Sequence, residues 1–215
     1  MFSIINFYFY LKMPSKVTKL TYFGLYGRVS AVKFQLKHGG CNFETRDVSM
    51  EEWGGMKAQY GSMPIAQLDD GTEIQETMPI SRMIAIELGQ YPEDPLQGYE
   101  NDRLMNIYYD LFNAMSGPQL SGDKKRITET AKAKLIPFLD SIEARLGKSK
   151  WLVGDKICMV DFWVGAMYTD KLTNEMGHMD CFKFALDSHP NFVRYGEDFK
   201  KENAAWLAER PKLAM

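Results

Sequence analysis

Residues 64–88 read PIAQLDDGTEIQETMPISRMIAIEL, and this stretch decides the fold class. The short apolar runs Ile65–Leu68 and Thr72–Ile74 flank an Asp-Asp-Gly turn. Asp-Gly between two such runs is a strong signal for a β-hairpin. Pro79–Leu88 follows with apolar residues at helical spacing and is closed by Gly89, which predicts a helix. The stretch therefore predicts two antiparallel strands and a helix that covers them.

The sequence upstream of this hairpin completes a small mixed sheet. Lys19–Phe23 is rich in strand-forming residues, and Val29–His38 has helical spacing with two glycines just past its end. Asn42–Val48 alternates like an edge strand. The expected order is β-α-β, a loop, and then β-β-α. Such a unit makes a compact mixed sheet rather than a long parallel one.

The remainder of the chain predicts helices only. Tyr91–Pro95 is a proline-rich break and the expected linker. Pro137 is expected to kink the second of the helices that follow. The third is strongly apolar and is expected to be the buried centre of this part. The expected helices span residues 101–115, 127–146, 160–172 and 192–206.

The domain organisation follows from these segments. Residues 17–91 are expected to form the α/β domain, 92–96 the linker and 97–215 the all-helical domain. Residues 1–11 are almost wholly apolar, but no basic residue precedes the run and no small-residue cleavage site follows it, as a signal peptide would require. The run also suits a strand or a sticky tail. We expect residues 1–16 to be an extension outside the fold, with Met13 as a second possible start.

Composition and charge exclude several classes of function. The 215 residues carry 26 basic and 28 acidic side chains, so a net charge of −2 gives no case for binding nucleic acid or an anionic membrane. The three cysteines form neither a C-x-x-C motif nor a disulfide framework, which favours a reducing, cytoplasmic location. The three histidines show no metal-ligand spacing, and we expect no metal.

The order of elements and several separate motifs resemble the cytosolic glutathione S-transferases over about residues 17–213. The first motif is Leu20-Thr-Tyr-Phe23 with Gly27-Arg28 behind it. The pattern looks most like the sigma class and its relatives, the S-crystallins and the glutathione-dependent prostaglandin D synthases. The resemblance implies a thioredoxin-like N-terminal domain that binds glutathione and an all-α C-terminal domain. It also implies a homodimer.

In this family a tyrosine at the end of the first strand holds the glutathione thiol, and here that residue would be Tyr22. A free thiol has a pKa of about 8.5, so little thiolate exists at neutral pH. A hydrogen bond to a charged acceptor supplies about 1.5–3 kcal/mol, and a helix N-terminus adds about 0.3–1 kcal/mol. Tyr22, the helix that starts near Val29, and Arg28 could together stabilise the thiolate. The alternative is that Tyr22 only packs at a strand end.

The segment from Trp53 to Pro64 resembles the glutathione loop of the family. The resemblance implies that Trp53 and Lys57 hold the glycine carboxylate of glutathione. Met63-Pro64 matches the cis-proline site, where the backbone of Met63 would pair with the cysteinyl unit like one rung of an antiparallel ladder. Most X-Pro bonds are trans, which is the alternative. Ser62 departs from the common glutamine, which puts one contact in doubt.

Two further motifs concern the ends of glutathione and the partner subunit. Glu76-Thr77 resembles the pair that grips the γ-glutamyl end, and Thr77 could equally be a simple N-cap. The resemblance implies that Asp110 reaches the glutathione amine of the partner subunit, although an exposed helical Asp is usually only solvated. Tyr60 either plugs a pocket of the partner or is an exposed loop residue. An acidic cluster that binds a metal in some prostaglandin D synthases is mostly missing, with Asn106 at one of its positions.

A fifth motif concerns folding. Gly154–Phe162 resembles the N-capping box and hydrophobic staple of the family, in which Asp161 would cap back from the third helical position. The cap position is Cys158, where the family has Ser or Thr. A thiol accepts a hydrogen bond weakly, so this helix start should be less stable by about 0.5–2 kcal/mol.

The sequence predicts a detoxification-type enzyme in which the glutathione thiolate attacks an apolar electrophile. The expected electrophile pocket contains Tyr26, Tyr108 and Phe112. Two alternatives stay open: a non-catalytic structural or glutathione-binding protein like the S-crystallins, and an isomerase such as a prostaglandin D synthase. No cysteine lies near Tyr22, which argues against disulfide chemistry of the glutaredoxin or omega type.

Overall fold

A four-stranded mixed sheet forms the N-terminal part of the protein, whose computed structural model describes residues 15–213. The strand order is β2-β1-β3-β4, with β1 parallel to β2 and antiparallel to β3, and β3 antiparallel to β4. The predicted hairpin is confirmed as β3 and β4. The strands are β1 (Val17–Phe23), β2 (Glu44–Val48), β3 (Ile65–Leu68) and β4 (Glu73–Gln75).

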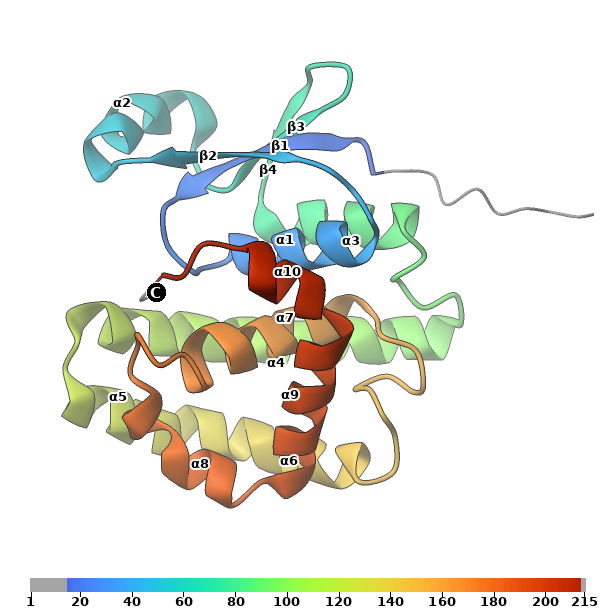
Figure 1. The fold of residues 1–215 in the computed structure, drawn as a ribbon, viewed down its shortest axis with the longest axis vertical. Coiled ribbons are helices and arrows are strands. Elements are labelled where there is room, and N and C mark those ends of the chain that lie inside the picture. Colours follow the sequence, from blue (N-terminus) through green and yellow to red (C-terminus); the bar gives the residue numbers. More distant parts are fainter. Residues whose placement is uncertain (1–14, 214–215) are drawn as a thin grey trace, which may run out of the picture.

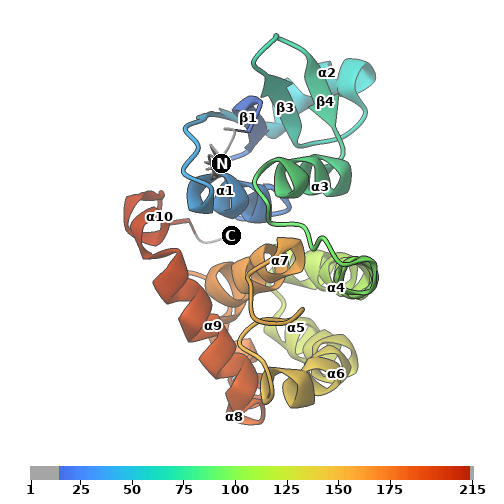
Figure 2. The ribbon, with the colours of Figure 1, turned by 90° about the vertical axis from the view of Figure 1, so that its right-hand side faces the viewer.

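Three helices accompany the sheet. α1 (Val29–His38) and α3 (Thr77–Glu87) lie between the sheet and the helical domain, and α2 (Met50–Tyr60) lies on the other side of the sheet (Figures 1 and 2). The expectation of a loop in place of α2 was wrong. Ser49 caps this helix by accepting a hydrogen bond from the backbone N–H of Glu52 at 3.0 Å. This Ser-x-x-Glu pattern is a helix-start signal present in the sequence.

The C-terminal part is a helical domain, as predicted, and its helices pack in layers below α1 and α3 (Figure 2). Its α-helices are α4 (Pro95–Ser121), α5 (Lys124–Thr130), α6 (Ile136–Leu146), α7 (Met159–Met167), α8 (Lys183–Asp187), α9 (Pro190–Glu202) and α10 (Ala204–Glu209).

Two of the predicted long helices contain π-helical turns, in which the helix widens. The turn Ala131–Leu135 ends two residues before Pro137, whose ring cannot pack against an ordinary preceding α-turn. The turn Tyr168–Leu172 continues α7. The last predicted helix is divided into α9 and α10 at Asn203. The spacing of apolar residues in the sequence does not distinguish these π-helical turns from regular α-helix.

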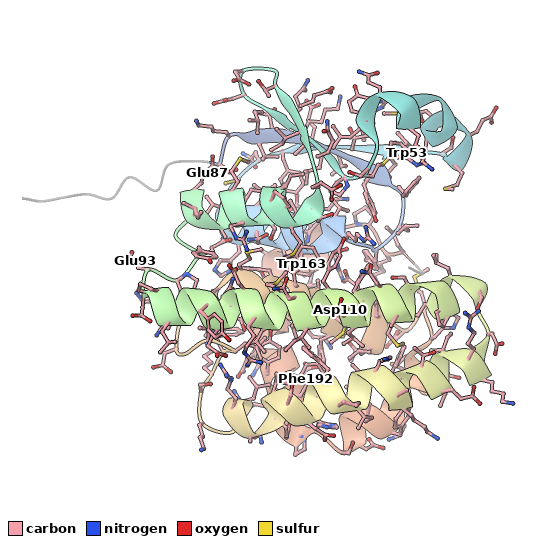
Figure 3. All side chains as sticks on the ribbon, turned by 180° about the vertical axis from the view of Figure 1, so that it is seen from behind. Trp53, Glu87, Glu93, Asp110, Trp163 and Phe192 are labelled. Carbon is pink, nitrogen blue, oxygen red and sulfur yellow. The ribbon has the colours of Figure 1, made fainter. Side chains whose placement is uncertain are left out.

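A buried polar chain joins the sheet side to the helical domain at Trp163 of α7 (Figure 3). Its indole N–H donates to Ser81 Oγ of α3 at 2.8 Å, and Ser81 Oγ donates to Gln35 Oε1 of α1 at 2.6 Å. Phe34 of α1 packs edge-on against Phe199 of α9, with ring centroids 5.0 Å apart. These contacts set the position of α1, and therefore of the strand end that precedes it, relative to the helices.

The start of α7 contains the predicted capping residue. Asp161 is fully buried and accepts hydrogen bonds from the backbone N–H groups of Cys158 at 2.9 Å and Leu152 at 3.0 Å. Asn101 of α4 accepts the N–H of Val160 at 3.0 Å and lies 3.6 Å from the Cys158 thiol. A side chain from another helix thus supplies an acceptor that the weakly accepting thiol would provide poorly.

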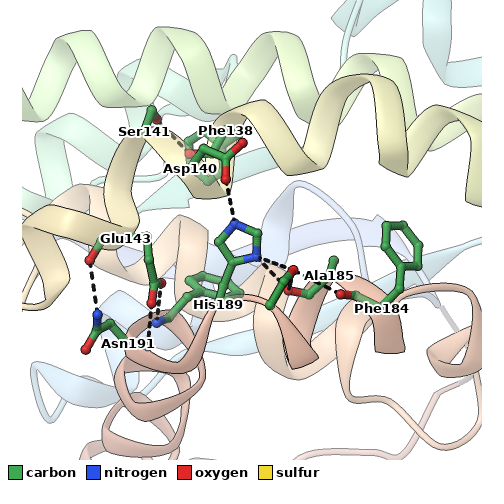
Figure 4. A network of polar contacts seen from close by, with 10 residues as sticks. Phe138, Asp140, Ser141, Glu143, Phe184, Ala185, His189 and Asn191 are labelled. Atoms are coloured by element: carbon green, nitrogen blue, oxygen red, sulfur yellow. Dashed lines mark hydrogen bonds and ion pairs between the residues drawn. The ribbon is translucent and has the colours of Figure 1, made fainter.

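The seam between α6 and α9 is held by polar contacts (Figure 4). Glu143 accepts hydrogen bonds from the backbone N–H groups of Asn191 at 2.8 Å and Phe192 at 3.0 Å, so its carboxylate caps the N-terminus of α9. His189 is buried between Asp140, 3.1 Å away, and the carbonyl oxygen of Ala185, 2.7 Å away. Both nitrogens of this histidine therefore have structural partners.

The predicted N-terminal extension, residues 1–16, lies outside the described residues except for its last two. Ser15 Oγ donates to Glu87 Oε2 at 2.8 Å, and the backbone N–H of Lys16 donates to the same oxygen at 3.3 Å. These bonds tie the approach to β1 to the end of α3. Within residues 15–213, no helix has the length and apolar character needed to cross a bilayer.

Candidate functional site

A cavity of about 500 Å³ opens between the end of β1 and the helical domain. The sheet side of its wall includes Tyr22, Tyr26 and Arg28 from β1 and the turn after it, and Trp53 from α2. The helical side includes Phe112, Ser116, Leu120 and Lys171. The fold thus brings together residues from both domains, and most of the wall is apolar.

Tyr22 is the second-last residue of β1 and is 9% exposed. Its hydroxyl oxygen accepts a hydrogen bond from the backbone N–H of Arg28 at 3.4 Å, and no described residue accepts its proton. Burial raises the pKa of Tyr22, and the N–H of Arg28 only partly opposes this effect. The hydroxyl is therefore protonated at neutral pH and available as a donor toward the cavity.

The close approach of Gly27 to this hydroxyl leaves no room for a side chain. A Cβ atom at Gly27 would lie 2.9 Å from Tyr22 Oη and 3.0 Å from Leu25 Cδ1. Glycine at this position therefore lets the turn after β1 return to the tyrosine. In this conformation of the turn, the backbone N–H of Arg28 donates a hydrogen bond to the hydroxyl oxygen of Tyr22.

The side chain of Arg28 reaches across to α4. Its Nη2 donates to Asn113 Oδ1 at 2.8 Å, and its guanidinium carbon lies 5.2 Å from the ring centroid of Tyr109 and 5.8 Å from that of Phe112. Neutral and aromatic partners surround it, and it forms no ion pair with a described carboxylate. This cation can accordingly attract an anion into the cavity.

The other residues predicted to bind glutathione divide into two groups. Trp53 lines the cavity and packs edge-on against Phe23, with ring centroids 6.3 Å apart, whereas Lys57 is exposed in the last turn of α2 and does not line it. The Met63–Pro64 bond is cis. Met63 belongs to the same buried cluster as Tyr22. Neither Met63 nor Pro64 lines the cavity itself.

Glu76 and Thr77 also lie outside the cavity wall, at the start of α3. Ser62 Oγ donates to Glu76 Oε1 at 2.7 Å, which joins the loop before Met63 to the start of this helix. Glu76 occupies the N-cap position with a φ of 74°, and its side chain makes no capping bond. The alternative that Thr77 is the N-cap was wrong, because Thr77 is the first helical residue and is buried.

The structure brings two of the three residues expected in the electrophile pocket to the cavity wall. Phe112 and Tyr26 line the cavity, and the hydroxyl of Tyr26 donates to the carbonyl oxygen of Pro211 at 2.6 Å. Tyr108 does not line this cavity. It is 3% exposed, and its ring packs against Phe138 and Trp163 in the core of the helical domain. Tyr108 is one turn of α4 before Phe112, and the face that it occupies points into the bundle rather than toward β1.

Asp110 is exposed on α4 and lies away from the cavity wall (Figure 3). It makes no hydrogen bond or ion pair with a described residue. Tyr60 donates its hydroxyl proton to Glu73 Oε2 at 2.8 Å. Within residues 15–213, no group of three or more His, Cys, Asp or Glu side chains could hold a metal ion.

Lys171 is a cavity residue that the sequence reasoning missed. It is 8% exposed in the π-helical turn after α7, and its Nζ donates to Gln119 Oε1 at 3.1 Å. The signal available was a pair of charged residues, Asp170-Lys171, near the end of an otherwise apolar helix. A lysine is almost never buried unless its ammonium is paired, so one in an apolar helix indicates a polar or charged partner.

Comparisons with known proteins agree with this architecture. Residues 107–210 match the family model described as Glutathione S-transferase, C-terminal domain. S-crystallin SL11 of Nototodarus sloanii is 24% identical over 89% of this chain and 98% of its own length. The hematopoietic prostaglandin D synthase of Gallus gallus is 25% identical over 92% of this chain and 98% of its own. A solved structure of the Fasciola hepatica sigma class glutathione S-transferase shares the fold, with a TM-score of 0.76 and 21% identity over 92% of this chain and 98% of that chain. By its fold the chain is similar to the glutathione S-transferases, and its helical part carries the match to their C-terminal domain.

Proposed function

We propose that this protein is a glutathione transferase in which Tyr22 holds the sulfur of glutathione as a thiolate. The supporting observation is the protonated Tyr22 hydroxyl on the wall of the cavity, whose oxygen already accepts the N–H of Arg28. That arrangement leaves the hydroxyl proton for a second acceptor. A thiolate is the acceptor that the chemistry requires, because a hydrogen bond to an anion favours the charged form.

We assign the rest of the proposed glutathione site to α2, the loop after it and the start of α3. Trp53 and Lys57 would hold the glycine carboxylate, the Met63–Pro64 segment the cysteinyl unit, and Glu76 with Thr77 the γ-glutamyl end. The bond between Ser62 and Glu76 supports this assignment because it holds the last two segments together. Arg28 would add positive charge near the sulfur. The thiolate would then attack an electrophilic carbon held against Tyr26 and Phe112, forming a carbon–sulfur bond while the leaving group departs.

The experiment is conjugation of 1-chloro-2,4-dinitrobenzene with glutathione, comparing wild type with Tyr22→Phe. Loss of a hydrogen bond to a charged acceptor costs about 1.5–3 kcal/mol, so kcat/KM should fall by roughly 10- to 150-fold. Tyr99→Phe is the matched control, because Tyr99 is exposed on α4 far from the cavity lining. Equal activity of Tyr22→Phe and wild type would remove Tyr22 from this role.

The alternative functions give different outcomes in the same assay. A protein that is retained on immobilised glutathione but conjugates nothing would behave as a non-catalytic binding protein, as the similarity to S-crystallins would allow. A glutathione-dependent isomerase would use the same tyrosine and differ in the electrophile side of the cavity. Activity that depends on Tyr22 favours the transferase over the binding protein.

We also propose that the protein is a cytoplasmic homodimer. Its three cysteines are all buried and unpaired, as is usual for proteins of a reducing compartment. Asp110 and the neighbouring Ile107, which is 37% exposed, leave this part of α4 available for a partner subunit. Light scattering of the purified protein should give a mass of about twice 24.7 kDa. A monomer would remove the role proposed for Asp110 and Tyr60 across the interface.

A further inference from the structure

The charges on the cavity wall are of one sign. Two cationic side chains, Arg28 and Lys171, line the cavity, and its lining contains no Asp or Glu. Both cations approach the same aromatic ring, since Lys171 Nζ lies 5.2 Å and the Arg28 guanidinium carbon 5.8 Å from the centroid of Phe112. An apolar cavity with two cations and no acid favours an anion with an apolar body.

Lys171 is the less satisfied of the two cations. Its ammonium has three donors, and the described hydrogen bonds account for one, to the neutral Gln119 Oε1. No described carboxylate forms an ion pair with it. The neighbouring Asp170 binds Arg210 Nη1 at 2.6 Å and Thr169 Oγ1 at 2.8 Å through Oδ1, and its buried Oδ2 has no hydrogen-bond partner among the described residues. Lysines are almost never this buried without an acidic partner.

The position of Lys171 separates it from the proposed glutathione site. Tyr22 and Trp53 come from the sheet and α2, whereas Lys171, Ser116 and Leu120 come from the helical side of the same cavity. Arg28 lies between them, because it follows β1 in the chain and reaches Asn113 on α4. A ligand that enters beside the thiol would therefore meet Lys171 at the part of the wall contributed by the helices.

We propose that Lys171 is a specificity-determining residue whose ammonium binds the carboxylate of an electrophile with an otherwise apolar body. The bound carboxylate supplies the acceptor that the protein lacks there, and Phe112, Leu120 and Tyr26 contact the apolar part. The proposal rests on the proposed function in one respect, that the bound acid is an electrophile. The binding of an apolar carboxylate can be measured without any reaction. The substrate class is thus an acid such as an alkyl or aryl carboxylate that carries a reactive carbon.

The first test is equilibrium binding of decanoate and of its uncharged analogue decanamide, measured by calorimetry on the full chain at pH 7. Wild type should bind decanoate more tightly than decanamide. Lys171→Met should weaken decanoate binding by about tenfold or more, the usual size of a charge-assisted hydrogen bond, and leave decanamide within about twofold. Lys171→Arg should restore most of the preference. Lys132→Met is the matched control, because Lys132 is exposed in the other π-helical turn.

The second test uses the reaction. Wild type and Lys171→Met are compared with 4-chloro-3-nitrobenzoate and with its methyl ester, at saturating glutathione. Lys171→Met should raise KM for the acid by about tenfold while kcat changes little, and it should leave KM for the ester within about twofold. A merely structural role for Lys171 would change the parameters of both electrophiles together.

The outcomes separate this proposal from the proposed function. Decanoate binding that depends on Lys171 in a protein that conjugates neither electrophile would overturn the transferase and support the anion site. Equal effects of Lys171→Met on acid and neutral ligands, or no binding of decanoate by wild type, would overturn the anion site and leave Tyr22-dependent conjugation untouched.

Discussion

The two walls of the cavity differ in how the protein builds them. On the sheet side, the end of β1 and the turn after it place Tyr22, Gly27 and Arg28 within seven consecutive residues, and a backbone N–H makes the key contact. On the helical side, Phe112 and Lys171 are far apart in sequence and meet only through packing of α4 against the continuation of α7. The proposed thiol-activating wall is therefore built by residues close together in the chain, whereas the electrophile wall depends on tertiary packing.

The largest effect is expected from a substitution on the sheet side of the cavity. Gly27→Ala would place a Cβ atom 2.9 Å from Tyr22 Oη, so the turn or the tyrosine must move. A displaced Tyr22 hydroxyl would lose its hydrogen bond to the thiolate, worth about 1.5–3 kcal/mol, so we expect kcat/KM to fall by roughly 10- to 150-fold. The loss should be the same for the acid and ester electrophiles, because both depend on the same thiolate.

Gly24→Ala is the control for this substitution. A Cβ atom at Gly24 would meet only the side chain of Asp47, at 3.4 Å, which is an ordinary contact. Its activity should stay close to that of wild type. A Gly27→Ala protein with full activity would show that the fit between Gly27 and Tyr22 does not matter for catalysis.

A smaller effect should distinguish the two walls by pH. Burial lowers the pKa of Lys171 to about 8, and the nearby Asp170 carboxylate opposes this shift. The other groups that face this amine, Gln119 and Phe112, do not titrate, and Arg28 lies across the same ring. The ammonium is charged below its pKa, so decanoate affinity should fall by about tenfold from pH 7 to pH 9. Decanamide affinity should stay level.

The Tyr22 side of the cavity should not respond to pH over this range. The pKa of Tyr22 is raised above its usual value near 10, so its hydroxyl remains a donor throughout. Binding titrations at pH 7, 8 and 9 with wild type and Lys171→Met would measure the difference. Decanoate affinity that is flat with pH in wild type would contradict the assignment of the titrating group to Lys171.

The sequence predicted the parts of the fold and site that depend on neighbours in the chain. The hairpin after Pro64, the helix after it and the motif around Tyr22 are local patterns, and each lies where expected. The capping residue Asp161 was also found, because its spacing from Cys158 is a local signal. The helix α2 was not predicted, although Ser49 and Glu52 form a Ser-x-x-Glu pattern that indicates a helix start.

The parts that the sequence did not predict depend on which face of a helix points where. Tyr108 and Phe112 lie one turn apart on α4, yet one is buried in the helical core and the other lines the cavity. Only the packing of α4 against α7 and β1 decides between them. Lys171 was overlooked because an apolar stretch predicts burial, while the direction of one charged side chain depends on the widened turn after Met167.

In the π-helical turn after α7, two consecutive side chains make contacts in different parts of the protein. Asp170 forms an ion pair with Arg210 at the end of α10, whereas Lys171 lines the cavity. A π-helical turn holds one residue more than the α-turn it replaces. Removing a single residue there would restore regular winding and rotate the amine out of the cavity without altering α7 itself. Evolution, or a protein engineer, could thus switch the charge preference of the cavity by changing the length of the chain rather than its composition.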